Sequence, residues 1–248
     1  MKSSKKPFGK LAKHIQKHDD HGFKRLFQRT ISAQLHLFGL IVGLVGFIFL
    51  AIAAKDHPDP RHLWACLAFG ITSLGVFGAS TIYHFLADGF RISPEFEKWL
   101  HDLDHFAIYL FIAGSYTPFI LNVIAPPWDL YLMIAIWTIA LLGISYTHFH
   151  LRLPNALQHR YVATAIYVLM GWTLIVRAQE TFGKITTQSG LLLVAGGLSY
   201  TFGAVIYALK KPNPLPGWFG YHEIWHVAVI MGYTFHYFLI LGFYKTLA

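Results

Sequence analysis

The chain contains seven apolar runs, and each is long enough to cross a lipid bilayer as a helix. A segment inside the bilayer must bond every backbone N–H and C=O internally, so such runs form helices. Short breaks rich in Pro, Gly, Asp or Thr separate them, and no break is long enough to link two domains. We predict an all-α fold, a seven-transmembrane-helix bundle that occupies residues 31–248, with spans at residues 31–54, 62–87, 103–124, 130–146, 161–177, 190–209 and 222–243.

The composition agrees with an integral, multi-pass membrane protein. Hydrophobic residues make up 55% of the chain and charged residues only 13%, whereas soluble domains carry roughly 25% charged residues. A soluble core could not hide so much apolar surface. Cys66 is the single cysteine, which excludes an intramolecular disulfide and a thiolate metal cluster. The first 30 residues contain no apolar segment of the kind that a cleavable secretory signal requires.

Residues 1–30 form a basic tail that we expect on the cytoplasmic side. The tail holds nine Lys or Arg against two Asp, so it carries +7 of the net charge of +8. Because the tail runs directly into an apolar span, anionic lipid headgroups are the expected partner and nucleic acid is not. The alternative is a disordered leader that only sets the topology. His14, His18 and His21 are interpreted as solvated tail residues and not as a metal cluster.

The distribution of positive charge predicts the orientation of the bundle. With the N-terminus inside, the inner segments hold 15 Lys or Arg and the outer segments hold 5. Positive residues concentrate on the cytoplasmic side of membrane proteins. We therefore predict a cytoplasmic N-terminus and an external C-terminus.

Five polar residues inside the predicted spans share one depth. Ser80 and His84 lie four residues apart near the end of the second span, Asp104 opens the third, and His222 and His226 lie four apart at the start of the seventh. A spacing of four places side chains on one face of a helix. With the N-terminus inside, all of them lie at the inner leaflet. Ionisable groups at membrane depth are candidates for function.

Three histidines and one carboxylate at one level predict a zinc site. A set of three His ligands leaves the fourth tetrahedral position open for water, as in catalytic sites, and zinc lowers the pKa of that water to about 7. Asp104 is the candidate to hold or deprotonate the water, and Ser80 is the candidate to hydrogen-bond a ligand or an oxyanion. In the alternative interpretation, the histidines pair with backbone carbonyls in a polar bundle core.

Residues 222–226 also read His-Glu-x-x-His, the string in which zincins carry two ligands and a general-base glutamate on one helix. An intramembrane protease of the site-2 type is therefore a competing hypothesis. It leaves Ser80, His84 and Asp104 unexplained, and the role of Glu223 stays open.

Four further residues could belong to the surroundings of the site. His236 lies roughly 15 Å beyond His226 along a helix, too far to share the metal, and is expected to pack or to line a cavity. His105 points about 100° away from Asp104 and is expected at the interface or beside the ligands. Ser115 and Tyr233 each lie eleven residues past a site residue, where they would line a lipid cavity or allow close helix packing.

At these residues the chain resembles the bacterial hemolysin III family, a branch of the progestin and adipoQ receptor superfamily that is related to alkaline ceramidases. The resemblance covers roughly residues 31–243 and is carried by residues 80–84, 103–109, 113–119 and 219–226. It implies a bacterial inner (plasma) membrane protein with seven helices and a zinc site near the inner leaflet. By the same resemblance, His84, His222 and His226 bind zinc, Asp104 holds a water and Ser80 is the matching serine. Ala33, Gln34 and Leu35 precede His36 where the family usually has an acidic residue and an Asn.

The leading hypothesis is a zinc-dependent intramembrane hydrolase of lipid amides or esters that acts in membrane lipid homeostasis. The alternatives are a non-enzymatic sensor of the membrane or a receptor-like protein with a structural zinc, and a pore-forming hemolysin. No polar stripe runs the length of any predicted span, which disfavours a pore. A proton or ion transporter is disfavoured because the acidic residues gather at one end of the bundle.

Overall fold

The computed structural model describes residues 30–150 and 156–245, and these residues are helical apart from connecting turns and one isolated β-bridge between Leu215 and Phe219. The basic tail therefore lies outside the described residues. The elements are α2 (Ile31–Ala54), α3 (Arg61–Gly89), α4 (Pro94–Val123), α5 (Trp128–His150), α6 (Ala156–Gly171), the 3₁₀ helix η1 (Thr173–Arg177), α7 (Ala178–Lys184), α8 (Thr187–Leu209) and α9 (Tyr221–Lys245).

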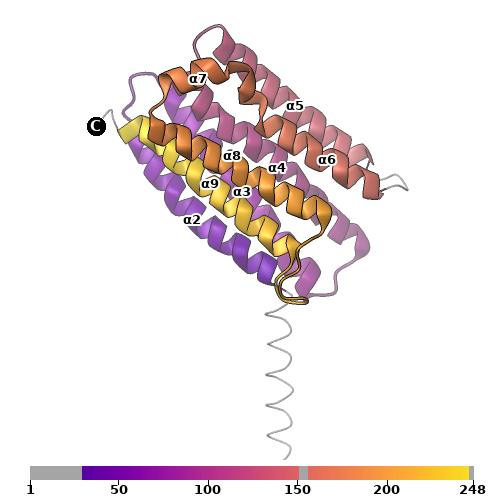
Figure 1. Cartoon of the computed structure of the whole chain (residues 1–248). Coiled ribbons are helices and arrows are strands. Elements are labelled where there is room, and N and C mark those ends of the chain that lie inside the picture. The colour runs from indigo at the N-terminus through magenta and orange to yellow at the C-terminus, as the bar shows by residue number, and fades with distance from the viewer. Residues whose placement is uncertain (1–29, 151–155, 246–248) are drawn as a thin grey trace, which may run out of the picture.

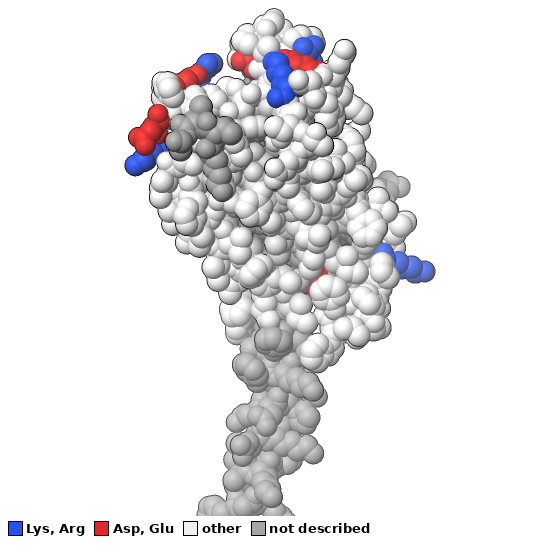
Figure 2. Space-filling model, turned by 60° about the vertical axis from the view of Figure 1, so that its left-hand side comes forward, with Lys and Arg blue, Asp and Glu red and all other residues white. Residues whose placement is uncertain are grey.

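Seven helical segments of this structure are long and apolar enough to cross a membrane, which confirms the predicted all-α, seven-span fold. Six spans are single helices, and the fifth combines α6, η1 and α7. Figure 2 shows the acidic and basic side chains toward the ends of the described body, with long uncharged flanks between them. Such an uncharged band suits the hydrocarbon layer of a bilayer.

The spans pack side by side as a closed ring (Figure 1). Each helix contacts the next from α2 through α5, α6 contacts α5 and α8, and α9 closes the ring by packing on both α8 and α2. Helix α4 also contacts α6 and α9, so it lies toward the interior. The ring brings the end of α3, the first half of α4 and the start of α9 to one end of the bundle.

An aromatic core fixes α3, α4 and α9 against one another next to that end. Phe77 of α3 meets Tyr233 of α9 edge-on, with ring centroids 5.3 Å apart, and Phe69 stacks on Tyr233 at 5.6 Å. Phe111 of α4 completes the group, at 6.4 Å from Phe77. Rigid packing of this kind holds the polar side chains one or two turns away in fixed positions.

Helix α4 begins at Pro94, nine residues before the predicted start of the third span at residue 103. Ser93 caps the helix because its Oγ accepts a hydrogen bond from the Phe96 N–H at 3.3 Å, and Pro94 and Glu95 suit a first turn. The first turns of α4 are polar and exposed, so a search for apolar runs could not find them.

The fifth span is interrupted, whereas the apolar pattern predicts one run over residues 161–177. Helix α6 ends at Gly171, and the chain continues through η1 into α7, which extends the span to Lys184. Tyr116 of α4 bonds both sides of the break: its hydroxyl donates to the Gly171 carbonyl oxygen at 2.7 Å and accepts from the Leu174 N–H at 3.4 Å. Neighbouring side chains that take up the freed backbone groups make such breaks possible in a membrane.

Candidate metal centre

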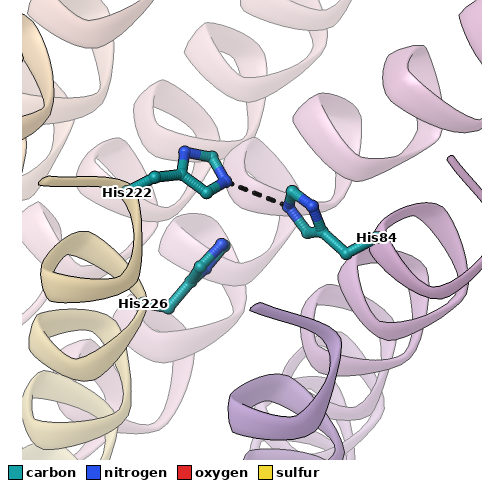
Figure 3. Close-up of side chains that lie close together, drawn as sticks. All are labelled: His84, His222 and His226. Atoms are coloured by element: carbon teal, nitrogen blue, oxygen red, sulfur yellow. Dashed lines mark hydrogen bonds between the residues drawn. The ribbon is translucent and has the colours of Figure 1, made fainter. Parts of the chain in front are cut away.

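Three histidines from two distant segments of the chain converge at one end of the bundle. His84 lies near the end of α3, and His222 and His226 lie one turn apart at the start of α9 (Figure 3). Each offers one ring nitrogen, and the three nitrogens lie within 4.8 Å of one another. The ring centroids are 4.5 to 4.9 Å apart. The structure therefore brings together the three residues that were predicted as ligands.

The spacing of one nitrogen pair fits a tetrahedral metal site. His84 Nε2 and His222 Nε2 are 3.1 Å apart. Two nitrogens bound to one zinc at about 2.0–2.1 Å in tetrahedral geometry would be about 3.3 Å apart. Both ring nitrogens of His226 are buried and have no hydrogen-bond partner within the described part of the chain. A metal ion between the three rings would satisfy a lone pair of His226 that no described protein group satisfies.

Asp88 determines which nitrogen of His84 faces this centre. The Asp88 carboxylate lies one turn further along α3, and its Oδ2 is 2.9 Å from His84 Nδ1. Because an ionised carboxylate only accepts, Nδ1 carries the hydrogen and Nε2 presents its lone pair toward His222. Metal-binding histidines usually have such a carboxylate partner on the other nitrogen.

The alternative interpretation was that the histidines of the bundle bond to backbone carbonyls, and other histidines do so. His105 Nδ1 bonds the His101 carbonyl oxygen at 2.9 Å, and His236 Nε2 bonds the Leu193 carbonyl oxygen at 3.3 Å. The hydrogen bonds of His84 run instead to Asp88 and His222. His84 thus differs from His105 and His236.

Asp104 and Ser80 border the histidine cluster. Asp104, on α4, is buried and lines the cavity of about 110 Å³ that also exposes His84, His222 and His226. Asp104 and Ser80 both line an adjoining, largely apolar cavity of about 90 Å³, together with His226. The Ser80 hydroxyl is buried, and none of the described residues forms a hydrogen bond of normal geometry with it. Asp104 therefore stands at the junction of the two cavities, and Ser80 lines the apolar one beside it.

Glu223 has a structural role that does not fit the metalloprotease hypothesis. Its Oε2 accepts from the Gly220 N–H at 2.8 Å, and its Oε1 accepts from the Ser32 hydroxyl at 2.9 Å. The carboxylate therefore caps the start of α9 and joins it to α2. In a zincin the glutamate of the string faces the metal as a general base, whereas here both oxygens are engaged at the helix end.

The remaining sequence candidates lie in different surroundings. His236 both packs and lines a cavity, because its ring fills the space beside Gly196 and borders the 90 Å³ cavity. Ser115 lines the same cavity. His105 borders the cavity at the histidine cluster. Tyr233 belongs to the aromatic core and contributes to none of the described cavities.

Two residues at the site were missed at the level of sequence. Asp88 follows His84 at the same spacing of four that was used for the histidine pair. His36 was noted only in the motif comparison, although it lies near the start of α2, at the same end of the bundle, with its ring 4.1 Å from that of His226. The shared-depth argument, applied to the first span, would have included it.

Comparisons with known proteins show what the chain is similar to. The family described as "Haemolysin-III related" matches residues 25–237. The chain is 34% identical over 216 residues to "Hemolysin-3" of Bacillus cereus, which covers 86% of this chain and 90% of that protein. It is 28% identical to the "Hemolysin-3 homolog" of Bacillus subtilis (strain 168), with 86% and 93% covered. The human "Monocyte to macrophage differentiation factor" is 25% identical, with 86% and 83% covered.

Proposed function

Because the chain belongs to the haemolysin-III-related family of integral, multi-pass membrane proteins, we propose that it is a zinc-dependent intramembrane hydrolase of lipid amides or esters in a bacterial plasma membrane. The observation that carries the proposal is the convergence of three histidine nitrogens within 4.8 Å beside a buried carboxylate, Asp104. Three histidine ligands with one open position are the donor set of catalytic zinc sites.

In this proposal His84, His222 and His226 hold the metal, with His84 oriented by Asp88. When bound, zinc supplies a water that is acidic enough to ionise near neutral pH. A carboxylate beside such a site is suited to general-base work. Asp104 would take the proton of the water at a carboxylate oxygen and then give it to the departing amine or alcohol. The carbonyl carbon gains a bond to the water oxygen and loses its bond to nitrogen or to the ester oxygen.

Ser80 would bind the oxygen of the reacting carbonyl. Its hydroxyl is buried at the cavity wall that Asp104 shares, and no described residue of the protein uses it as a hydrogen-bond donor of normal geometry. A donor held ready for an oxygen that gains negative charge stabilises the transition state.

The cavities beside the site offer room for an acyl chain. The 90 Å³ cavity leads from Ser80 and Asp104 to Ser115 and His236, and a further cavity of about 130 Å³ shares Ser115 and His236 with it. The second cavity continues along η1 and α8 past apolar residues that include Leu174, Ile175, Phe182, Leu193 and Val194. A lipid substrate fits walls of this kind, because apolar pockets with a few polar groups bind amphipathic ligands.

The first experiment measures zinc per chain in protein purified in mild detergent. We expect about one zinc per chain in the wild type and a loss in His84→Ala and His222→Ala. His236→Ala is a matched control, because it removes a half-buried histidine outside the cluster. A folded wild type without metal would refute the proposed site.

The second experiment separates a catalytic metal from a structural one. Asp104→Asn is expected to keep the zinc and to lower hydrolysis of N-acyl and ester lipids by about 10²- to 10⁴-fold, the usual contribution of a general base. If Asp104→Asn and the wild type turn over lipid equally, or if the zinc-loaded wild type hydrolyses none, the zinc is structural and the sensor or receptor-like hypothesis takes its place.

A further inference from the structure

Unpartnered polar atoms gather on the wall of one cavity. Of the buried side-chain atoms in the described residues without a hydrogen-bond partner, most belong to His36, Ser80, Tyr200 and His226, and all four residues line the 90 Å³ cavity. Most of the remaining wall is apolar, including Val76, Ile108, Phe111, Ile112 and Val229. Buried polar atoms are almost always hydrogen-bonded in proteins. A wall of this composition is suited to a ligand that is apolar along its length and polar at one end.

His36 and Tyr200 are the residues of this group that the proposed chemistry does not use, and His36 lies next to a metal-site histidine. It lies on α2 with 3% of its surface exposed, edge-on to Phe77 with ring centroids 5.6 Å apart and edge-on to His226 at 4.1 Å. Both of its ring nitrogens are buried, and neither has a hydrogen-bond partner among residues 30–150 and 156–245. An apolar side chain of similar size would fill the same space, so packing alone does not explain an imidazole here.

His36 is not part of the converging ligand set. The donor atoms that lie within 4.8 Å of one another belong to His84, His222 and His226, and His36 is outside this group. His36 borders the 90 Å³ cavity with Ser80, Asp104 and His226, whereas it does not border the cavity at the histidine cluster. The ring therefore faces the space that the acyl part of a substrate would occupy.

We propose that His36 is a substrate-binding residue that donates a ring N–H hydrogen bond to the acyl carbonyl oxygen of a lipid in this cavity. A neutral imidazole has one N–H donor and one acceptor nitrogen, and a carbonyl oxygen of an amide or ester is a suitable acceptor. The inference rests on the proposed function and adds a second hydrogen-bond donor, besides Ser80, for the carbonyl oxygen. A lipid without an acyl carbonyl gains nothing from His36.

The test compares His36→Leu with His36→Asn, which keeps an N–H donor, in full-length protein loaded with zinc in mild detergent. Phe77→Leu is the matched control, because it changes the packing around the same ring without removing a donor. The probes are N-oleoylsphingosine, which has an acyl carbonyl, and sphingosine, which has none. Zinc content, binding of each probe and hydrolysis of N-oleoylsphingosine are measured for every variant.

We expect His36→Leu to keep its zinc, to bind N-oleoylsphingosine about 10-fold more weakly, as for one lost hydrogen bond, and to bind sphingosine as the wild type does. His36→Asn should recover part of the lost affinity, and Phe77→Leu should bind both probes normally. Unchanged binding of N-oleoylsphingosine by His36→Leu would overturn the inference. Loss of zinc in that variant would overturn it as well, because His36 would then serve the metal site.

The outcome also separates this inference from the proposed function. If the wild type binds N-oleoylsphingosine without hydrolysing it, the hydrolase function fails, and the affinity ratio of His36→Leu to wild type still decides the role of His36. If hydrolysis and binding are normal in His36→Leu, the hydrolase stands and the inference fails. A wild type that binds no N-oleoylsphingosine would contradict the inference directly.

Discussion

The carboxylate of Asp88 determines which ring nitrogen His84 offers to a metal. Asp88→Asn tests this role, because it replaces one carboxylate oxygen by an amide nitrogen. Asp88→Asn replaces the acceptor of the 2.9 Å contact to Nδ1 by an amide, which weakens the hold on the ring. We expect zinc affinity to fall about 10- to 100-fold, as for other partners of metal-binding histidines. The measurement is competition with a chelator of known affinity.

Asp56→Asn is the control for Asp88→Asn, because the exposed Asp56 carboxylate pairs only loosely with Lys55, at 3.8 Å. It should leave zinc affinity unchanged. Equal affinity in wild type and Asp88→Asn would show that His84 is oriented by other contacts.

Glu223 is expected to affect stability and not chemistry. Glu223→Ala removes the acceptor of both the Gly220 N–H and the Ser32 hydroxyl. The free energy of unfolding should fall by about 1–2 kcal/mol, as for other lost helix caps and buried hydrogen bonds. Denaturant unfolding in detergent measures this loss, and zinc content should be unchanged.

Ser32→Ala gives the comparison for Glu223→Ala, since it removes only the contact between α2 and α9. Its loss of stability should be smaller. If Glu223→Ala abolished lipid or peptide hydrolysis at normal stability, the glutamate would act in catalysis after all.

The three clustered histidines were predictable because two independent signals agreed. One signal was a spacing of four residues, between Ser80 and His84 and between His222 and His226, and the other was a common depth for separate spans. His36 lies four residues after Ser32, as His84 lies four residues after Ser80, so both signals applied to it as well. The capping role of Glu223 depends on a turn before α9 and on Ser32, which is 191 residues away in the chain. No local pattern encodes a contact of that kind.

The close approach of α3 and α4 depends on Gly114. A methyl group at this position would overlap the Thr72 Oγ1 atom and come within 2.9 Å of Thr72 Cβ. Gly114→Ala is therefore expected to destabilise the protein by about 1–3 kcal/mol, the usual range for an added methyl in a packed interior. Chemical unfolding in mild detergent measures the change.

Gly75 on α3 provides the control for Gly114, because an added methyl there meets nothing within 4 Å. Gly75→Ala should be neutral or stabilise the helix by up to about 1 kcal/mol. If Gly114→Ala left the free energy of unfolding unchanged, α3 and α4 could move apart without a loss of stability.

The interruption of the fifth span should depend on the hydroxyl of Tyr116. Tyr116→Phe leaves the Gly171 carbonyl oxygen and the Leu174 N–H without this partner. We expect a loss of about 1–2 kcal/mol in the free energy of unfolding. Tyr131→Phe, on an exposed face of α5, should have no effect. Equal stability of the two variants would contradict the assigned role.

The apolar pattern predicted every membrane-spanning segment but neither the polar start of α4 nor the break in the fifth span. Apolar runs report the hydrocarbon layer, and the first turns of α4 are exposed and polar. The break at Gly171 is stabilised by Tyr116 from another helix. A contact between helices that are distant in sequence leaves no periodic signal.

The closed ring of spans brings residues of separate helices together at the histidine cluster. Because α9 packs on α2 as well as α8, His36 of α2 comes next to His226, and Ser32 reaches Glu223. The sequence supports the number of spans, but their order around the ring follows from side-chain fit. The same closure leaves the cavities between α4, the fifth span, α8 and α9, where the proposed lipid substrate would place its acyl chain.

The orientation of this bundle is predicted to depend on the tail. The inner segments hold 15 Lys or Arg against 5 outside, but without residues 1–30 the count is 6 against 5. Alkaline phosphatase is active only outside the cytoplasm, so a fusion of it to the C-terminus of the wild type should be active. The fusion should lose much of that activity when the nine Lys and Arg residues of the tail are changed to Gln, because the remaining difference in positive charge is too small to fix one topology. A C-terminal green fluorescent protein fusion should show the opposite response.

The matched control for the tail variant replaces the five outer Lys and Arg residues by Gln, which increases the bias and should preserve an external C-terminus. Phosphatase activity that is low on the wild type would reverse the predicted orientation. The histidine cluster would then open toward the outside of the cell, where a hydrolase would meet lipids of the outer leaflet. If phosphatase activity is retained after the tail is neutralised, the bundle itself determines the orientation. The remaining role for the basic residues of the tail would then be to bind lipid headgroups.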